Sequence, residues 1–317
     1  MVMYLQVEFP IGLDGSDFVV CTTYTDVAFP PFPPGNISEI YEITLLNVFT
    51  GEIVSKLPVL LDSADDPFEA SPKAMILLEP NKYLVICGWI YTGTTDIAGR
   101  SLMAAVVVNI LSGAMEWIIH PYIAPVANQS TGTWGGGAYS VAFGPIVSGS
   151  VIIYWTENYN GYDNYINTAT ISSTGFTSGL FYRSPDIDIA GVAYDLINDI
   201  VVAYMADGSF RKISLAGTVI ETIPGSNPDF NINVGVENYQ ALFTNPKPGY
   251  VVSSEWTIYG NIYEINLDTC HAELVLDWST LTDYDVGKYY DQYQRIATEG
   301  SEYDGQIYRI SILEPMT

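Results

Sequence analysis

The sequence repeats one short pattern, in which an alternating run of β-branched and aromatic residues enters a tight turn and a second short run follows. Six copies occur, at residues 40–51, 106–113, 170–175, 210–217, 262–270 and 307–312. Glycine closes most of these turns, which suits them because glycine accepts a positive φ. Units of this size cannot each bury a hydrophobic face alone, so the repeat predicts neighbouring units that pack against one another.

Two more strand-like runs precede several of the hairpins. They lie at residues 74–78 and 83–87, 191–195 and 200–204, and 239–243 and 250–252. A unit of four antiparallel strands resembles the blade of the quinoprotein-like and WD-type β-propellers. The resemblance is one of pattern over nearly the whole chain, without a Trp-Asp signature, so it implies a fold and no activity.

The repeat therefore predicts an all-β protein with a single β-propeller domain over residues 1–317. About six four-stranded antiparallel blades are expected, at residues 4–62, 71–125, 137–183, 188–224, 236–278 and 282–314. A β-sandwich is the main rival, but sandwiches do not repeat one hairpin six times in order. Residues 4–9 fit either the first strand of the first blade, which we prefer, or the fourth strand of the sixth.

The charge balance limits the partners that this chain can have. It carries 36 Asp and Glu against 11 Lys and Arg, a formal net charge of -25. Nucleic acid and anionic membranes are therefore not expected partners, because both would be repelled. No run approaches the ~18 apolar residues of a membrane helix, and the first residues lack the basic region of a signal peptide. The abundance of Tyr and the scarcity of cations favour an extracellular or virion-surface protein.

The three cysteines, Cys21, Cys87 and Cys270, are too few and too widely spaced for a disulfide framework or a CxxC metal motif. We predict that they are small buried residues. Cys270 is expected at the turn position that glycine fills in four other copies, with no disulfide to Cys21 or Cys87.

Signals for catalysis are sparse. The chain has two histidines, His120 and His271, and no HExxH, Walker or G-x-S-x-G motif. The adjacent Cys270 and His271 indicate turn chemistry rather than a nucleophile pair, because neighbours on a strand face opposite ways. Carboxylate clusters at residues 62–69, 186–188 and 283–291 are interpreted as solvated loops, with calcium binding as the alternative. No cofactor and no metal is expected.

Aromatic and acidic residues recur where the second strand of a unit ends. In a propeller the loops after these strands lie on one face, so their side chains would gather around one rim. Flat rings stack on sugars or anchor protein partners, and carboxylates accept hydroxyl hydrogen bonds. The alternative is that the rings pack blade against blade. The candidate binding residues are Trp155, Glu157, Tyr159, Glu255, Trp256, Tyr259 and Glu299.

These observations favour a non-catalytic binding or structural propeller that contacts a glycan or a protein through this face. Assembly into a larger particle is a further expectation. Two alternatives stay open: a propeller hydrolase or lyase with a metal or carboxylate pair in its central channel, and an intracellular protein-interaction scaffold. A tightly bound divalent metal would favour the enzyme over the binding protein.

Overall fold

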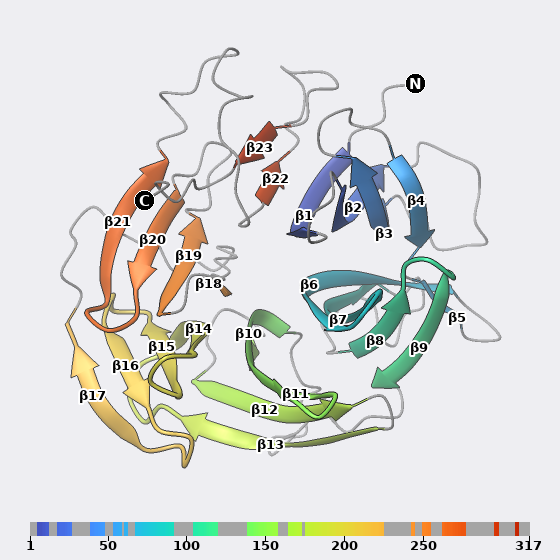
Figure 1. Ribbon diagram of the computed structural model, residues 1–317. Coiled ribbons are helices and arrows are strands. Elements are labelled where there is room, and N and C mark those ends of the chain that lie inside the picture. Colours follow the sequence, from blue (N-terminus) through green and yellow to red (C-terminus); the bar gives the residue numbers. More distant parts are fainter. Residues whose placement is uncertain are drawn as a thin grey trace. The chain divides into compact units, whose positions relative to one another are not determined.

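In the residues that it describes, the computed structural model of the chain consists mainly of β-strands and turns (Figure 1). It describes residues 5–12, 18–26, 39–47, 53–58, 60–62, 67–91, 104–119, 138–157, 164–172, 175–224, 242–244, 249–254, 262–276, 295–297 and 308–310. These ranges contain no helix, and so none that is long and apolar enough to cross a membrane. The predicted all-β class is confirmed.

Four sheets have four antiparallel strands in sequence order, which is the predicted order of a blade. The first contains β1 (Leu5–Gly12), β2 (Phe18–Asp26), β3 (Glu39–Asn47) and β4 (Ile53–Pro58). The second contains β10 (Ala138–Val147), β11 (Ser150–Glu157), β12 (Tyr165–Ser172) and β13 (Gly175–Arg183). The third contains β14 (Ile189–Asp195), β15 (Ile200–Met205), β16 (Phe210–Ile213) and β17 (Val219–Ile223). The fourth contains β18 (Leu242–Thr244), β19 (Tyr250–Ser254), β20 (Ile262–Asn266) and β21 (His271–Leu276).

Two further sheets depart from the four-strand pattern. One has five strands: β5 (Leu60–Asp62), β6 (Pro67–Glu79), β7 (Lys82–Tyr91), β8 (Ala104–Asn109) and β9 (Ala114–Ile119). The other pairs β22 (Arg295–Ala297) with β23 (Tyr308–Ile310). Four four-stranded blades are thus present in the described residues, where about six were predicted. β1 is the first strand of its sheet, as the preferred placement of the N-terminal segment predicted.

The chain divides into two compact units. Unit 1 comprises Met1–Ser101, Val106–Glu116 and Leu281–Thr317, and unit 2 comprises Leu102–Ala105 and Trp117–Thr280. In unit 1, β22 lies against β1. In unit 2, the first strands of three successive blades, β10, β14 and β18, contact one another. Convergence of first strands is the arrangement of propeller blades, whereas the single domain and the blade boundaries stay predictions.

Alternation along β15 explains how unit 2 forms two cores. Val201, Ala203 and Met205 pack with residues of the β10–β13 blade. Val202 and Tyr204 pack with residues of the β18–β21 blade. Successive side chains on a strand point to opposite faces, so a blade between two others buries both faces, and its second strand β15 is apolar throughout.

In each four-stranded sheet a β-bulge interrupts the fourth strand, whereas the second and third strands pair regularly. One extra residue interrupts the register of β4, β13, β17 and β21, whereas the described pairs β2–β3, β11–β12, β15–β16 and β19–β20 are regular. A bulge increases the local twist of its strand. It also disrupts the row of unpaired backbone groups that an edge strand would offer to another chain.

The turns between third and fourth strands have the predicted backbone geometry. Positive φ angles occur at Gly113 (72°), Gly175 (153°), Gly217 (76°) and Cys270 (53°). The placement of Cys270 at a glycine position is therefore confirmed. Cys270 is also a free thiol, as predicted. The turn at Gly51 and the side chains of Cys21 and Cys87 lie outside what the structure describes.

Two of these turns lie against the outer strand of the preceding blade. A Cβ at Gly113 would lie 3.2 Å from Cδ2 of Leu57 on β4. A Cβ at Gly217 would lie only 2.5 Å from the backbone oxygen of Phe181 on β13. Gly217 therefore serves both the left-handed backbone and a close approach between blades.

Candidate functional site

Trp155 of the predicted binding face lies in the interior of unit 2. It is on β11 and is 1% exposed, and its indole Nε1 has no hydrogen-bond partner. A ring buried to this extent offers no face to a ligand in this state. Its burial favours the alternative reading for this residue, in which the ring packs inside the protein.

The other six predicted binding residues have no described side chains. Glu157 is the last residue of β11, and only its backbone is described. The remaining five lie outside the described residues: Tyr159, Glu255, Trp256, Tyr259 and Glu299. Their strands are nevertheless informative, because β11 and β19 are the second strands of their sheets and end at Glu157 and Ser254. The predicted loops therefore begin at equivalent ends of two blades in unit 2.

The described polar chemistry of unit 2 centres on β16, whose residues alternate between the two neighbouring blades. Phe210 packs into the core shared with the β18–β21 blade, and Ile213 packs into the core shared with the β10–β13 blade. Between them lie Arg211 and Lys212, which are 7% and 8% exposed. Alternation directs these two cations to opposite sides of the blade.

Arg211 binds the end of the preceding blade. Its Nη1 donates to the Tyr182 hydroxyl at 2.9 Å and to Ser184 Oγ at 3.0 Å, and its Nη2 donates to Asp186 Oδ1 at 2.8 Å. The Ser184 hydroxyl also donates to Asp186, at 3.2 Å. We call Tyr182, Ser184, Asp186 and Arg211 the Arg211 junction.

The electrostatics of the Arg211 junction follow from these contacts. Hydrogen bonding from Arg211 lowers the pKa of Asp186 below its ordinary value, against a smaller opposing effect of burial. Burial alone would lower the pKa of the guanidinium, but its bonds to Asp186 and Tyr182 raise it. Both groups are therefore charged at neutral pH, as a planar guanidinium fork with several acceptors requires.

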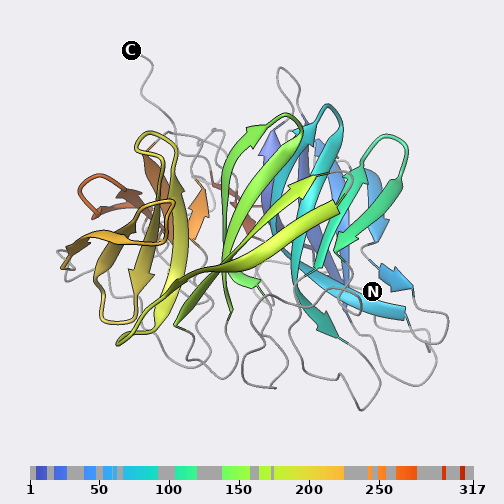
Figure 2. The same ribbon diagram turned by 90° about the horizontal axis from the view of Figure 1, so that it is seen from below.

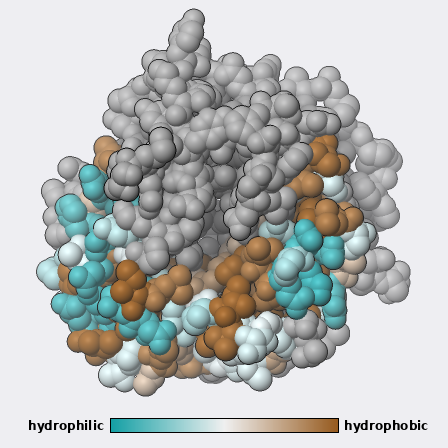
Figure 3. Space-filling model, viewed as in Figure 1, coloured by the Kyte–Doolittle hydropathy of each residue, from teal (hydrophilic) through white to brown (hydrophobic). Residues whose placement is uncertain are grey.

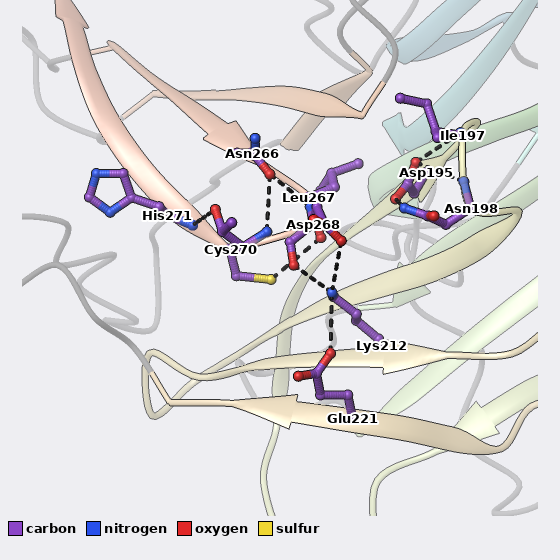
Figure 4. Close-up of polar contacts among 11 residues, drawn as sticks. Asp195, Ile197, Asn198, Lys212, Glu221, Asn266, Leu267, Asp268, Cys270 and His271 are labelled. Atoms are coloured by element: carbon purple, nitrogen blue, oxygen red, sulfur yellow. Dashed lines mark hydrogen bonds and ion pairs between the residues drawn. The ribbon is translucent and has the colours of Figure 1, made fainter.

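Lys212 binds the following blade (Figure 4). Its Nζ donates to the backbone oxygen of Asp268 at 2.5 Å, and lies 3.7 Å from the Asp268 carboxylate. Glu221, opposite Lys212 on β17, lies 3.2 Å from the same Nζ. We call Lys212, Glu221 and Asp268 the Lys212 junction, which joins the outer strand of one blade to a turn of the next.

The turn that carries Asp268 is ordered by its own side chains. Asn266 Oδ1 accepts hydrogen bonds from the backbone N–H groups of Asp268 and Thr269. Cys270 is 2% exposed, and burial raises the pKa of its thiol to about 12, with only partial relief from nearby Lys212. His271 is exposed. A buried thiol that stays protonated is a poor nucleophile, which agrees with interpreting this pair as turn chemistry.

A second polar cluster orders the β14–β15 turn. Asp195 is fully buried, and its carboxylate accepts hydrogen bonds from the backbone of Ile197 and Asn198 and from the Asn198 amide. The Tyr194 hydroxyl donates to Asp199. Burial is the larger cause, and this hydrogen bond the next, of a raised pKa of Tyr194. The Tyr194 ring stacks on Tyr154 of the preceding blade at 5.7 Å. These groups hold the turn rigid and join two blades.

Sequence reasoning did not single out Arg211 or Lys212 and missed both junctions. Asp186 and Asp268 lie 25 and 56 positions away from the cations that they bind, so no local motif reveals these two contacts. One signal was available: adjacent cations on a strand predicted to be buried on both faces must each meet an acceptor from a neighbouring blade. Within the described ranges, no group of three or more His, Cys, Asp or Glu is placed to hold a metal ion.

Comparisons with known proteins give distant likenesses of fold. No protein-family model and no curated protein matches the sequence. A crystal structure of a nidogen/laminin complex is similar at a TM-score of 0.48 and 11% identity, covering 85% of this chain and 78% of that chain. A protein of unknown function from Bacteroides caccae is similar at a TM-score of 0.43 and 11% identity, covering 91% and 76%. No family is shown by these likenesses, and the propeller arrangement rests on the strand order and contacts of the chain itself.

Proposed function

We propose that the chain is a non-catalytic binding propeller of about six blades, working outside the cell or on a virion surface. It contacts a glycan or a protein through the loops that follow the second strands of its blades. The observation that carries this proposal is the equivalent position of the two strand ends from which candidate loops start. They begin after β11 and β19, the second strands of two blades in one compact unit.

The two junctions on β16 support the same function. Arg211 and Lys212 belong to a set of only 11 cations, and both are used to bind one blade to its neighbours. Such contacts favour a rigid frame, on which loops can be held in fixed positions. Rigid elements hold binding residues more precisely than mobile ones do, and at a smaller entropic cost.

Two tryptophans provide a matched test of this proposal. Trp256→Ala should weaken binding by ~2 kcal/mol or more, the cost typical of an aromatic anchor, and should leave thermal stability nearly unchanged. Trp155→Ala, at a ring that is 1% exposed, should instead cost ~3–5 kcal/mol of stability. Binding of the intact protein to a glycan array and to host-cell surfaces would identify the ligand. Calorimetry would measure the thermal stability of each variant.

A large fall in melting temperature for Trp256→Ala would contradict the proposal, because it would place that ring in the core as well. Unchanged binding by a stable Trp256→Ala variant would also contradict it.

A further inference from the structure

Apolar side chains are exposed to solvent at the tips of two hairpins of unit 2. Val147 is 63% exposed and Ile197 is 64% exposed, and their neighbours Ile146 and Leu196 are 41% and 46% exposed. Turns normally carry Gly, Asn, Asp, Ser or Pro, so Leu196 and Ile197 are unusual within the β14–β15 turn, and Ile146 and Val147 end β10 directly before the turn at Ser148 and Gly149. We call Ile146, Val147, Leu196 and Ile197 the AB-turn surface, since the turns join first and second strands.

The two turns belong to neighbouring blades and lie at the same end of unit 2. Figure 2 shows the β10–β11 and β14–β15 turns at one end of their blades. Just below them, a Cβ at Gly144 would lie 3.6 Å from Cε2 of Tyr194. Figure 3 shows apolar surface over both of these blades. The AB-turn surface is therefore a surface shared by two blades.

Ile197 extends this surface toward a third blade. Its Cδ1 lies 2.9 Å from where a Cβ at Gly249 would stand, so the Ile197 side chain covers the glycine of the β18–β19 turn. The turn that holds Ile197 is fixed by the buried Asp195 carboxylate. The turn that carries Leu196 and Ile197 is consequently ordered before any partner binds, which lowers the entropic cost of binding.

Charge decides which partner suits the AB-turn surface. The chain has a formal net charge of -25, and the exposed Asp199 lies in the same turn as Ile197. A second copy of the chain would bring the same charge and would be repelled, whereas a cationic partner would be steered toward the protein. Apolar contacts would then supply the buried centre of the interface, and Lys or Arg of the partner its rim.

We propose that the AB-turn surface docks a partner protein through a segment that carries Lys or Arg beside apolar side chains. This surface lies at the opposite end of the second strands from the loops of the proposed binding face. It does not depend on that function, and Trp256→Ala should leave it unaffected.

The test uses the full chain as bait for a random displayed-peptide library. Enriched peptides should combine aliphatic or aromatic residues with Lys or Arg. Their affinity should fall at least about tenfold for a Val147→Ser, Ile197→Ser double variant, as expected for loss of central apolar contacts. Leu180→Ser is the matched control, since Leu180 is 45% exposed on the outer strand β13, and it should bind like the unchanged protein.

Several results would overturn the proposal. Enrichment of peptides without cations or without apolar residues would contradict the stated chemistry. Equal affinity for the double variant and the unchanged protein would place binding elsewhere, and no enrichment at all would show that the surface does not recognise such segments. Concentration-dependent self-association that the double variant abolishes would identify a second copy as the occupant instead.

Discussion

The blade β14–β17 meets its two neighbours through contacts of different character. At the Arg211 junction, a guanidinium whose side chain is 9% exposed bonds to two hydroxyls and one carboxylate of the preceding blade and its connection. At the Lys212 junction, an ammonium group lies between two carboxylates and one carbonyl oxygen, and the carboxylate side chains are 54% and 77% exposed. The first junction depends on directional hydrogen bonds, whereas the second depends more on charge in contact with water.

The third-to-fourth-strand turns differ in the same way. Gly217 meets the backbone of the preceding blade so closely that no Cβ fits. Cys270, at the equivalent turn of the next blade, carries a side chain that packs into the shared core. The same position of the repeat therefore excludes a side chain at one interface and buries an apolar side chain at the next.

The largest effect is expected for Gly217→Cys, which places at the first interface the residue found at the second. The new Cβ would meet Phe181 O at 2.5 Å, and the backbone would keep a φ of 76°. Left-handed backbone and overpacking together should cost at least ~3 kcal/mol, measured as a shift in the urea midpoint. A loss below ~1 kcal/mol would show that the blades separate easily at this point.

Arg211→Met should have the next largest effect. It removes three hydrogen bonds from a buried position, and should lower the free energy of unfolding by about 2–3 kcal/mol. The cost stays below that of a fully buried pair because the Asp186 side chain that remains is 58% exposed. Arg211→Lys is the control, because it keeps the charge but cannot serve three acceptors in a plane. Its free energy of unfolding should therefore lie between those of Arg211→Met and the unchanged protein. Equal stability of Arg211→Lys and the unchanged protein would show that charge alone matters here.

The fold was the part that the sequence pattern could predict. Recurring hairpins predicted the strands, their order and the glycine turns. They could do so because the residue type at each turn reflects the φ angle that the turn requires. Cys270 illustrates this: the repeat places it at a glycine position, and its φ is 53°. Blade number was less predictable, since β5 adds a strand to one sheet and only β22 and β23 of another are described.

The candidate site was less predictable than the fold. Trp155 follows the pattern of the candidate binding face, yet it is 1% exposed, because a strand end alone does not show whether a ring faces solvent or the next blade. Arg211 and Asp186 are joined only by blade packing, 25 positions apart. Local patterns record backbone geometry, whereas contacts between blades depend on register and twist.

Lys212→Met should cost less than Arg211→Met, at about 1 kcal/mol, because its carboxylate partners are largely exposed and screened. The cost should shrink in about 1 M NaCl, where the Debye length is ~3 Å. Urea unfolding at low and high salt would measure both values. Arg211→Met serves as the comparison, since its loss should change little with salt. A salt-independent loss at Lys212 would assign the effect to its bond with the Asp268 backbone.

Asp186→Asn should have a smaller effect, and one that depends on pH. The pKa of Asp186 is lowered from 3.8 in the folded protein, so the carboxylate stabilises the fold above that value and the contribution disappears as pH falls through the lower folded pKa. The melting temperature of Asp186→Asn should therefore be lower near neutral pH and should approach that of the unchanged protein in strong acid. Parallel melting curves at all pH values would contradict this linkage.

Cys270→Gly should have the smallest effect, within ~1 kcal/mol of zero. Glycine removes the backbone strain of a non-glycine residue at a φ of 53°, which should stabilise the fold by roughly 1 kcal/mol. Loss of the buried thiol should cost a similar amount. Cys270→Ala keeps the strained backbone and still loses the sulfur, so it should be the less stable of the two variants by urea unfolding. If Cys270→Gly were instead as damaging as Gly217→Cys, packing of the thiol would dominate the turn. The difference between the turns at Gly217 and Cys270 would then come from the Cys270 side chain and not from the backbone conformation.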